Sequence, residues 1–318
     1  KSIGEEARYR NKTVLLGPGV NIYRSPLNGR NFEYMGEDPY LAGKMVVPYI
    51  QGVQQNGVAA CVKHYALNNQ EVNRHTTNVI VDDRALHEIY LPAFKAAVQA
   101  GKAWAIMGSY NLYKDQHGCH NQYLLNDILK GDWGFDGVVV SDWGGVHNTQ
   151  EAITNGLDME FGSWTNGLSN GSSNAYDNYY LAMPYLERIK SGKVGTKELD
   201  DKVRRILRLA FRTTMDANRP LGSILSPEHY EAARRIGEEG IVLLQNNGGV
   251  LPIDLNKAKK IAVIGENAVK MMTVGGGSSS LKVQRELSPL DGIRKRVGDK
   301  AEVIYARGYV GDATGEYN

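Results

Sequence analysis

The chain alternates short apolar runs with longer amphipathic segments, and this alternation constrains its fold more than any other feature. The apolar runs are Val14–Leu16, Val58–Val62, Ala105–Met107, Val138–Val140 and, more weakly, Leu157–Phe161. The segment Asp83–Gln99 between two of them repeats apolar residues at helical spacing. Because strands that alternate with helices form parallel sheets, the pattern predicts an α/β fold.

Polar residues follow three of the apolar runs directly. Lys63 and His64 follow the second run, Ser109 and Tyr110 follow the third after Gly108, and Asp142 follows the fourth after Ser141. A (β/α)8 barrel places its site on the carboxyl ends of its strands in this way. A doubly wound sheet would carry a glycine-rich phosphate turn after its first strand, and no G-x-G-x-x-G is present there. We therefore predict a (β/α)8-type barrel.

The chain is long enough, at 318 residues, for two domains. We expect a barrel domain at 1–215 closed by a helix at 190–215, a proline-containing linker at 216–227, and the first part of an α/β sandwich domain at 228–318. The elements expected in the second domain are a helix at 228–240, strands at Ile241–Leu244, Ile261–Ile264 and Val303–Tyr305, and a loop at Gly275–Ser280.

Composition excludes several classes of partner. The net charge is only +2 and no basic run stands out, which argues against nucleic acid. No apolar run reaches 18 residues, so no membrane span is expected. The two cysteines, Cys61 and Cys119, leave one bridge or two free thiols open. The oligomeric state is equally open, a homodimer included.

Asp142 is the strongest candidate for chemistry. A carboxylate at the mouth of a buried strand is costly without a function, and carbohydrate sites pair acids with aromatic rings such as that of Trp143. The same position also suits an N-cap of the following helix. Lys63 and His64 are two donors suited to binding adjacent sugar hydroxyls. The same pattern also fits a histidine satisfied in the core and a lysine that extends outward to solvent. Arg30 and Arg74 suit hydroxyl or carboxylate binding, or are exposed surface charges.

Two other motifs are set aside. The sequence His117-Gly118-Cys119-His120 resembles a metal site but lacks a second ligand cluster at zinc spacing. The glycine-rich segment Gly275–Ser280 lacks the following Lys-Ser or Lys-Thr of a phosphate loop. We therefore expect neither a metal nor an organic cofactor.

Taken together in order, the motifs of the chain resemble glycoside hydrolase family 3, in its β-glucosidase and β-xylosidase branch. The matching motifs are Gly29-Arg30-Asn31-Phe32-Glu33 with Gly36-Glu37-Asp38-Pro39, Lys63-His64-Tyr65-Ala66-Leu67-Asn68-Asn69-Gln70-Glu71 with Arg74, Met107-Gly108-Ser109-Tyr110-Asn111, Gly134-Phe135-Asp136-Gly137 with Ser141-Asp142-Trp143-Gly144, Gly156-Leu157-Asp158-Met159-Glu160, and Gly275-Gly276-Gly277-Ser278-Ser279. Each motif alone is weak, but six in this order are specific.

The resemblance implies a barrel followed by an α/β sandwich with the active site between them, and no cofactor. It implies that Asp142 is the nucleophile of a retaining, exo-acting hydrolase that removes a non-reducing-end β-D-glucosyl residue from a β-glucoside or oligosaccharide by double displacement. The positions that it assigns to the substrate are Arg30, Lys63, His64 and Arg74 in the first sugar subsite, Tyr110 beside the nucleophile and Trp143 as an aromatic wall.

The chain departs from the family at both ends. The family's barrel starts earlier, with a first strand and a sugar-binding aspartate, and its acid/base glutamate is expected beyond Asn318; neither Glu302 nor Glu316 lies in a matching motif. The alternatives are a β-xylosidase of the same family and a carbohydrate-binding fragment or pseudo-enzyme without the acid/base. The resemblance also favours the periplasm or secretion.

Overall fold

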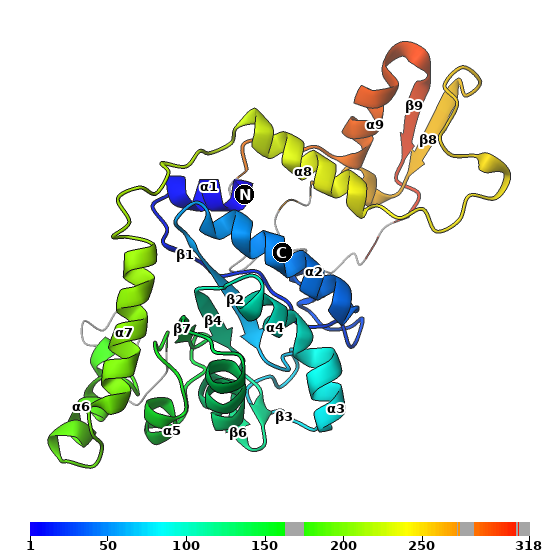
Figure 1. The fold of residues 1–318 in the computed structure, drawn as a ribbon. Helices are drawn as coiled ribbons and strands as arrows, with labels where there is room; N and C mark the ends of the chain where they lie inside the picture. The colour runs from blue at the N-terminus through cyan, green and yellow to red at the C-terminus, as the bar shows by residue number, and fades with distance from the viewer. Residues whose placement is uncertain (163–174, 272, 274–282, 310, 312–318) are drawn as a thin grey trace. The chain divides into compact units, whose positions relative to one another are not determined.

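The computed structural model describes residues 1–162, 175–271, 273, 283–309 and 311. The chain divides into two compact units, Lys1–His229 and Tyr230–Asn318 (Figure 1). The domain limits at residues 215 and 227 that the sequence suggests stay a prediction.

The helices and strands follow one another in an α/β order. The strands are β1 Val14–Leu15, β2 Ala59–Tyr65, β3 Asn78–Val79, β4 Ala105–Gly108, β5 Leu112–Tyr113, β6 Gln116–His117, β7 Val138–Val140, β8 Lys260–Ile264 and β9 Glu302–Ala306. The α-helices are α1 Ser2–Tyr9, α2 Pro39–Gln54, α3 Asp83–Ala85, α4 Pro92–Gln99, α5 Thr149–Thr154, α6 Met183–Lys190, α7 Lys197–Arg212, α8 Pro227–Gly240 and α9 Pro289–Val297. The 3₁₀ and π turns are η1 Asn31–Glu33, η2 Leu86–Tyr90, η3 Gly118–His120, η4 Tyr123–Asp132, η5 Ala175–Asn178, η6 Asn247–Gly249, η7 Glu266–Ala268 and η9 Gly298–Lys300.

The first unit is organised around a parallel sheet in the order β1-β2-β4-β7. These four strands correspond to the four stronger apolar runs of the sequence. The weaker run, Leu157–Phe161, was wrongly predicted as a strand: it makes one isolated parallel bridge, between Met159 and Val140. The Asp158 carboxylate accepts the Val139 N–H at 2.8 Å, so a side chain takes a place that a ladder bond would fill.

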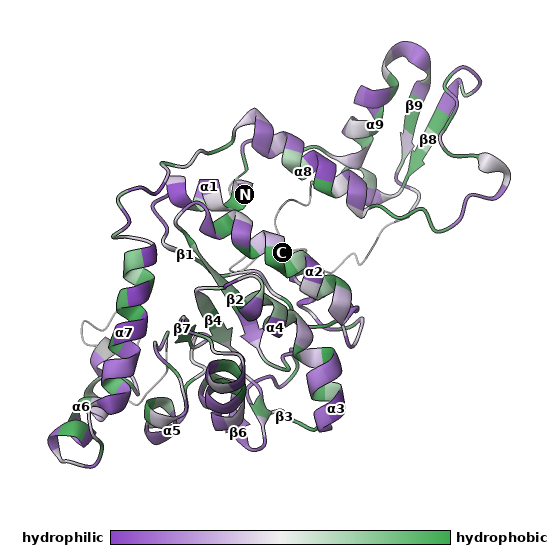
Figure 2. Ribbon diagram, viewed as in Figure 1, coloured by the Kyte–Doolittle hydropathy of each residue, from purple (hydrophilic) through white to green (hydrophobic). Residues whose placement is uncertain are grey.

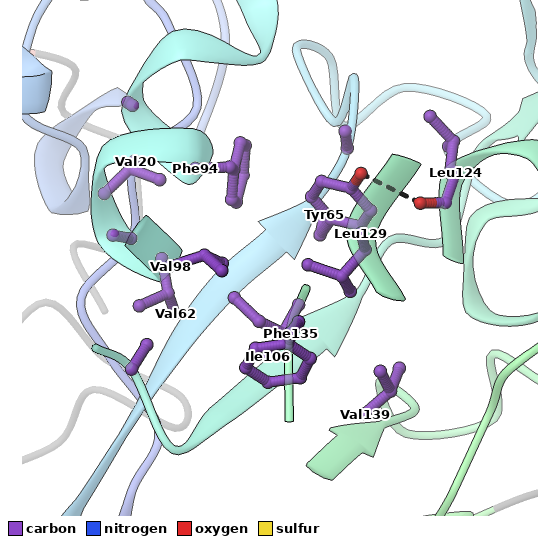
Figure 3. Packing of buried hydrophobic residues seen from close by; sticks show 14 of the residues in the cluster. Val20, Val62, Tyr65, Phe94, Val98, Ile106, Leu124, Leu129, Phe135 and Val139 are labelled. Carbon is purple, nitrogen blue, oxygen red and sulfur yellow. Dashed lines mark hydrogen bonds between the residues drawn. The ribbon is translucent and has the colours of Figure 1, made fainter. Parts of the chain in front are cut away.

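The core lies between this sheet and the helices that cover it. Val62, Ile106 and Val139, one from each of β2, β4 and β7, are fully buried. Figure 3 shows them among other buried apolar side chains, and shows the Tyr65 hydroxyl donating to the Leu124 carbonyl, a hydrogen bond of 2.9 Å. Burial of the apolar runs in these three strands explains why each run is continuously apolar.

The predicted helix over Asp83–Gln99 is divided into α3, η2 and α4. Pro92, which has no N–H to donate, stands at the first turn of α4 and marks the break. The apolar positions that we expected on one face are largely buried, but Ile89 is 39% exposed. The predicted closing helix is present as α7, which carries both hydrophobic and hydrophilic residues along its length (Figure 2).

In the second unit, β8 and β9 form a parallel pair in which Lys260 aligns with Glu302 and Ile264 with Ala306. These strands and helix α8, which crosses the boundary between the units, confirm three predicted elements. The strand predicted at Ile241–Leu244 is wrong. The segment has no ladder partner among the described residues and leaves Val242 and Leu244 exposed. The glycine-rich segment at 275–280 lies outside the described residues.

Two expectations from composition can be compared with the structure. Cys61 and Cys119 are both buried free thiols. In the part of the chain that the structure describes, no helix is both long and apolar enough to cross a membrane.

Candidate active site at the carboxyl ends of the strands

Three neighbouring parallel strands present their polar residues at one edge of the sheet. Lys63 and His64 lie near the carboxyl end of β2, Tyr110 follows β4, and Asp142 follows β7. Parallel neighbours end on the same side, so side chains that are far apart in the sequence meet there. His64 Nε2 lies 3.6 Å from Asp142 Oδ2.

The Asp142 carboxylate is buried but only half satisfied. Its side chain is 9% exposed. Oδ1 accepts the Trp143 N–H at 2.8 Å, whereas Oδ2 has no hydrogen-bond partner among the described residues. The N-cap alternative does not hold, because α5 is capped by Asn148, whose Oδ1 accepts the Glu151 N–H at 3.1 Å. A buried carboxylate oxygen without a partner is a costly arrangement, and such arrangements gather at functional sites.

The Cys119 thiol contacts the backbone of Asp142. The Asp142 N–H points to Cys119 Sγ at 3.4 Å, and this thiol donates to the Ser109 carbonyl at 3.4 Å. Gly145 packs so closely on the same sulfur that a Cβ there would lie 2.6 Å from it. The loop after β7 is therefore held against the loop after β4.

Burial and charge act in opposite directions on Asp142. Burial raises the pKa of the carboxyl above its ordinary value, and the N–H of Trp143, the Tyr110 hydroxyl and the charges of Arg30 and Arg74 oppose that rise. The charges of Arg30 and Arg74 therefore favour the ionised form of Asp142.

The three cations near the site are each held by a carboxylate. Lys63 Nζ lies 3.2 Å from Glu33 Oε2, and Arg30 binds the other oxygen of Glu33. Arg74 Nη1 donates to Glu71 Oε2 at 2.6 Å. The side chains of Arg30, Lys63 and Arg74 are 19%, 16% and 31% exposed, so none is a free surface charge.

Glu33 and Glu71 were part of the motifs read from the sequence but received no role there. Glu33 follows Arg30 by three residues, and Glu71 precedes Arg74 by three. An acid three residues from a candidate basic residue is the signal that would have found them. Tyr34, Asn21 and Asn68 were also missed. Asn68 donates to the Tyr34 hydroxyl, Tyr34 contacts the His64 ring and Asn21 bonds to the His64 backbone, and none of these contacts could be read from spacing.

Tyr110 and Trp143 form the aromatic part of the site. The Arg74 guanidinium lies 4.3 Å from the centre of the Tyr110 ring, and the Tyr110 hydroxyl donates to the Trp143 carbonyl at 2.8 Å. Trp143 is 49% exposed and packs on Phe161 with ring centres 5.1 Å apart. Gly162 has φ +58, and a Cβ there would lie 2.3 Å from the Trp143 ring. The exposed indole of Trp143 is therefore packed against Phe161 and Gly162.

In the His117–His120 motif, His120 bonds to the loop that carries Asp142, whereas His117 contacts the His75 carbonyl and stacks on the His147 ring. The His147 N–H points to His120 Nε2 at 3.2 Å, and His120 Nδ1 lies 2.7 Å from Glu151 Oε2. Burial lowers the pKa of His120 to about 3, and the neighbouring His117 and His147 add to this effect. Within the described residues, no three metal-binding side chains are grouped closely enough to hold an ion.

The opposite end of the strands carries a different feature. A cleft of about 670 Å³ there is lined by Trp104, Trp133, Asp136 and Arg212, among others. The residues that we expected to act on substrate all lie away from it, at the carboxyl ends of the strands.

Two family models match the chain. Residues 1–209 match the model described as glycosyl hydrolase family 3 N terminal domain, and residues 241–313 match glycosyl hydrolase family 3 C-terminal domain. The chain therefore belongs to glycoside hydrolase family 3, as its motifs suggested.

The relatives and solved structures agree with this assignment. The chain is 59% identical over 313 residues to beta-glucosidase BoGH3A of Bacteroides ovatus, covering 97% of this chain and 42% of that protein. It is 37% identical to an exo-alpha-(1->6)-L-arabinopyranosidase of Bifidobacterium longum, covering 98% of this chain and 40% of that protein. It also resembles the structure of beta-glucosidase 3B from Thermotoga neapolitana in complex with glucose, with a TM-score of 0.84, 36% identity and coverage of 96% and 41% of the two chains.

These comparisons confirm the predicted fold class, part of a (β/α)8-type barrel domain followed by the first part of an α/β sandwich domain. The chain spans about two fifths of the length of these relatives, 42% in the case of the Bacteroides protein.

Proposed function

We propose that the intact protein is a retaining, exo-acting β-glucosidase, in which Asp142 is the nucleophile and Arg30, Lys63, His64, Arg74, Tyr110 and Trp143 bind the substrate. The observation that carries this proposal is the state of Asp142. Its Oδ2 is buried and has no hydrogen-bond partner among the described residues, while Oδ1 is anchored by the Trp143 N–H. One oxygen is fixed and the other is free to react.

The reaction proceeds in two displacements. In the first, Asp142 Oδ2 attacks the anomeric carbon, the bond from that carbon to the glycosidic oxygen breaks, and an acid protonates the departing oxygen. In the second, a water oxygen attacks the same carbon, its proton passes to the conjugate base, and the bond to Oδ2 breaks. Two inversions return the sugar in its original configuration.

The cations contribute orientation and charge. Arg30 and Arg74 favour the ionised form of Asp142 against the effect of burial, which the attack requires. Lys63 and Arg30 share Glu33, so both are held in place before substrate binds. Because these donors are already in position, binding of the sugar hydroxyls also aligns the anomeric carbon with Asp142. The acid/base is the glutamate that the family resemblance implies, and we assign that role to no residue from 1 to 318.

Trapping of the glycosyl-enzyme tests the proposal directly. A 2-deoxy-2-fluoro-β-glucoside with a good leaving group slows the second step, so the intact protein should gain one sugar mass on the peptide that contains Asp142. The matched control is Asp136→Asn, which alters the aspartate before β7 and should be labelled normally. A label on any other carboxylate would overturn the assignment of the nucleophile.

A substrate panel tests the sugar class. We expect the aryl β-glucoside to have a higher kcat/KM than the aryl β-xyloside or the α-L-arabinopyranoside, the last included because a relative bears that activity in its name. Preference for the xyloside would favour the β-xylosidase alternative. Binding of glucose without turnover of any aryl glycoside would favour a carbohydrate-binding pseudo-enzyme.

A further inference from the structure

A chain of hydrogen bonds runs from the Glu71–Arg74 ion pair to the His64 ring, which faces the Asp142 carboxylate. Glu71, which binds Arg74, also accepts from Asn68 Nδ2 at 3.4 Å. The same Asn68 nitrogen donates to the Tyr34 hydroxyl oxygen at 3.2 Å, and that hydroxyl lies 3.1 Å from His64 Nδ1. The other ring nitrogen of His64 faces Asp142 Oδ2 at 3.6 Å.

The direction of each bond follows from the carboxylate at its start. An ionised carboxylate only accepts, so Asn68 must turn its NH₂ group toward Glu71. That group then also faces the Tyr34 hydroxyl oxygen, which accepts from it. Among the described residues this hydroxyl bonds only to Asn68 and His64, so its own proton is available only to His64 Nδ1. The Nδ1 atom accepts, and the imidazole proton is therefore on Nε2.

The surroundings of His64 support the same protonation. Burial lowers the pKa of His64 well below its ordinary value, and the charges of Arg30, Lys63 and Arg74 lower it further, so the ring is neutral. A neutral ring has one proton to place. If that proton were on Nδ1, the Tyr34 hydroxyl, in a residue only 6% exposed, would have no acceptor, and a bare Nε2 lone pair would face the Asp142 carboxylate.

We propose that Tyr34 is a positioning residue that fixes the His64 imidazole as the tautomer with its proton on Nε2, where it faces Asp142 and the sugar bound there. This inference rests on the proposed function for its kinetic consequences, but not for the tautomer itself. Asn21 completes the arrangement by pairing with the His64 backbone, accepting its N–H at 2.8 Å and donating to its carbonyl at 3.0 Å. Asn21 thus fixes the main chain, and Tyr34 determines which ring nitrogen donates.

The tautomer is tested first, without any assay of turnover. The intact protein is labelled with ¹⁵N-histidine, and the His64 signals are identified by their loss in His64→Gln. We expect Nε2 to resonate as a protonated nitrogen and Nδ1 as an unprotonated, hydrogen-bonded one. In Tyr34→Phe, the Nδ1 signal should move to that of a nitrogen without a donor. A wild-type spectrum with the proton on Nδ1 would overturn the proposal, whatever the fate of the proposed glucosidase activity.

A double-mutant cycle tests the kinetic role. The His64→Gln side chain can offer an amide N–H near the place of Nε2–H and has no tautomers. Tyr34→Phe should lower kcat/KM on an aryl β-glucoside about 10-fold in the wild-type background but less than about 2-fold in the His64→Gln background. Equal losses in both backgrounds would mean that Tyr34 serves only packing.

The matched control is Tyr23→Phe. The Tyr23 hydroxyl donates to the Tyr34 backbone carbonyl at 2.9 Å, so this change removes a hydroxyl from the same loop without touching the His64 ring. It should leave the His64 spectrum as in the wild type and change kcat/KM less than about 2-fold. A His64 shift as large as that of Tyr34→Phe would assign the effect to the loop and not to the Tyr34 hydroxyl.

Discussion

One aspartate lies next to each end of strand β7, and the two carboxylates differ in burial and in ion pairing. At the amino end, Asp136 is paired with Arg212 Nη2 at 2.7 Å, and Arg205 Nη1 donates to the Phe135 carbonyl at 2.8 Å. At the carboxyl end, Asp142 is more deeply buried and keeps one oxygen without a partner among the described residues. A satisfied charge indicates structure, whereas an unsatisfied one indicates function.

The pKa directions of the two carboxyls repeat this contrast. A hydrogen bond from Arg212 is the largest influence on Asp136 and lowers its pKa. Burial is the largest influence on Asp142 and raises its pKa. The fold therefore favours the ionised form at one end of the strand and disfavours it at the other. Each prediction below tests whether this difference separates a structural end from a catalytic end.

The largest expected effect is on turnover. Asp142→Asn keeps the shape of the side chain but removes the proposed nucleophile, so kcat on an aryl β-glucoside should fall on the order of 10⁴-fold. Asp136→Asn should change kcat less than about 2-fold, because only an exposed ion pair is lost. Both are measured on the intact protein at neutral pH. If the two variants lose similar activity, the contrast between the ends has no catalytic meaning.

The second effect concerns the first sugar subsite. Lys63→Ala and His64→Ala should each lower kcat/KM about 10–100-fold, because a buried sugar hydroxyl would lose its partner. Gln70→Ala is the control, since its side chain is exposed and, among the described residues, bonds only within its own loop to Val72 and Thr77. It should cost less than about 2-fold. Wild-type kinetics in both Lys63→Ala and His64→Ala would make these residues structural.

The features of the candidate site differ in how well they can be predicted from the sequence. The strands and the polar residues at their carboxyl ends are local features: three consecutive valines followed by Ser141 and Asp142 indicate both a strand and its functional end. The partners of those side chains are not local. Tyr34 meets His64 across thirty positions of sequence, and no periodicity encodes that contact.

The wrong strand predictions have the same origin. The segment Ile241–Leu244 has strand-like composition, but a strand exists only where a neighbour pairs with it, and pairing depends on distant residues. At Leu157–Phe161, the Asp158 side chain replaces part of the ladder. The sequence thus suffices for elements and single candidate residues, whereas the contacts of His64 with Tyr34 and with Asp142 require the loops in place.

The third expected effect compares two tryptophans, one at each end of the sheet. Trp143→Ala removes an exposed ring at the carboxyl end and should lower kcat/KM about 3–10-fold for substrates with an aromatic leaving group, and less for those with a small one. Trp104→Ala alters the cleft at the amino end and should change kcat/KM less than about 2-fold. Equal sensitivity of Trp143→Ala to all leaving groups would remove Trp143 from the leaving-group side.

The smallest effect is on stability, and here the two aspartates should differ in sign. Asp136 has a lowered pKa, so its ionised form stabilises the fold above the ordinary aspartate pKa of about 3.9, and this contribution disappears as the pH falls through the folded value. Asp136→Asn should therefore lower Tm at pH 7, by an amount that corresponds to less than about 1 kcal/mol because the ion pair is half exposed. The difference from wild type should shrink toward acid pH.

Asp142 has a raised pKa, so its protonated form is the one that the fold favours, and that contribution is lost as the pH rises through the folded value. At pH 7 the buried carboxylate destabilises the protein, and Asp142→Asn should raise Tm while abolishing turnover. The gain should narrow as the pH falls through the folded pKa of Asp142, because the wild-type carboxyl then becomes protonated as well. Thermal unfolding of both variants and wild type in matched buffers measures the two signs. A lower Tm for Asp142→Asn at pH 7 would mean that the ionised carboxylate is stabilised by its cations after all, and the contrast between the two ends of β7 would then be one of position and not of charge.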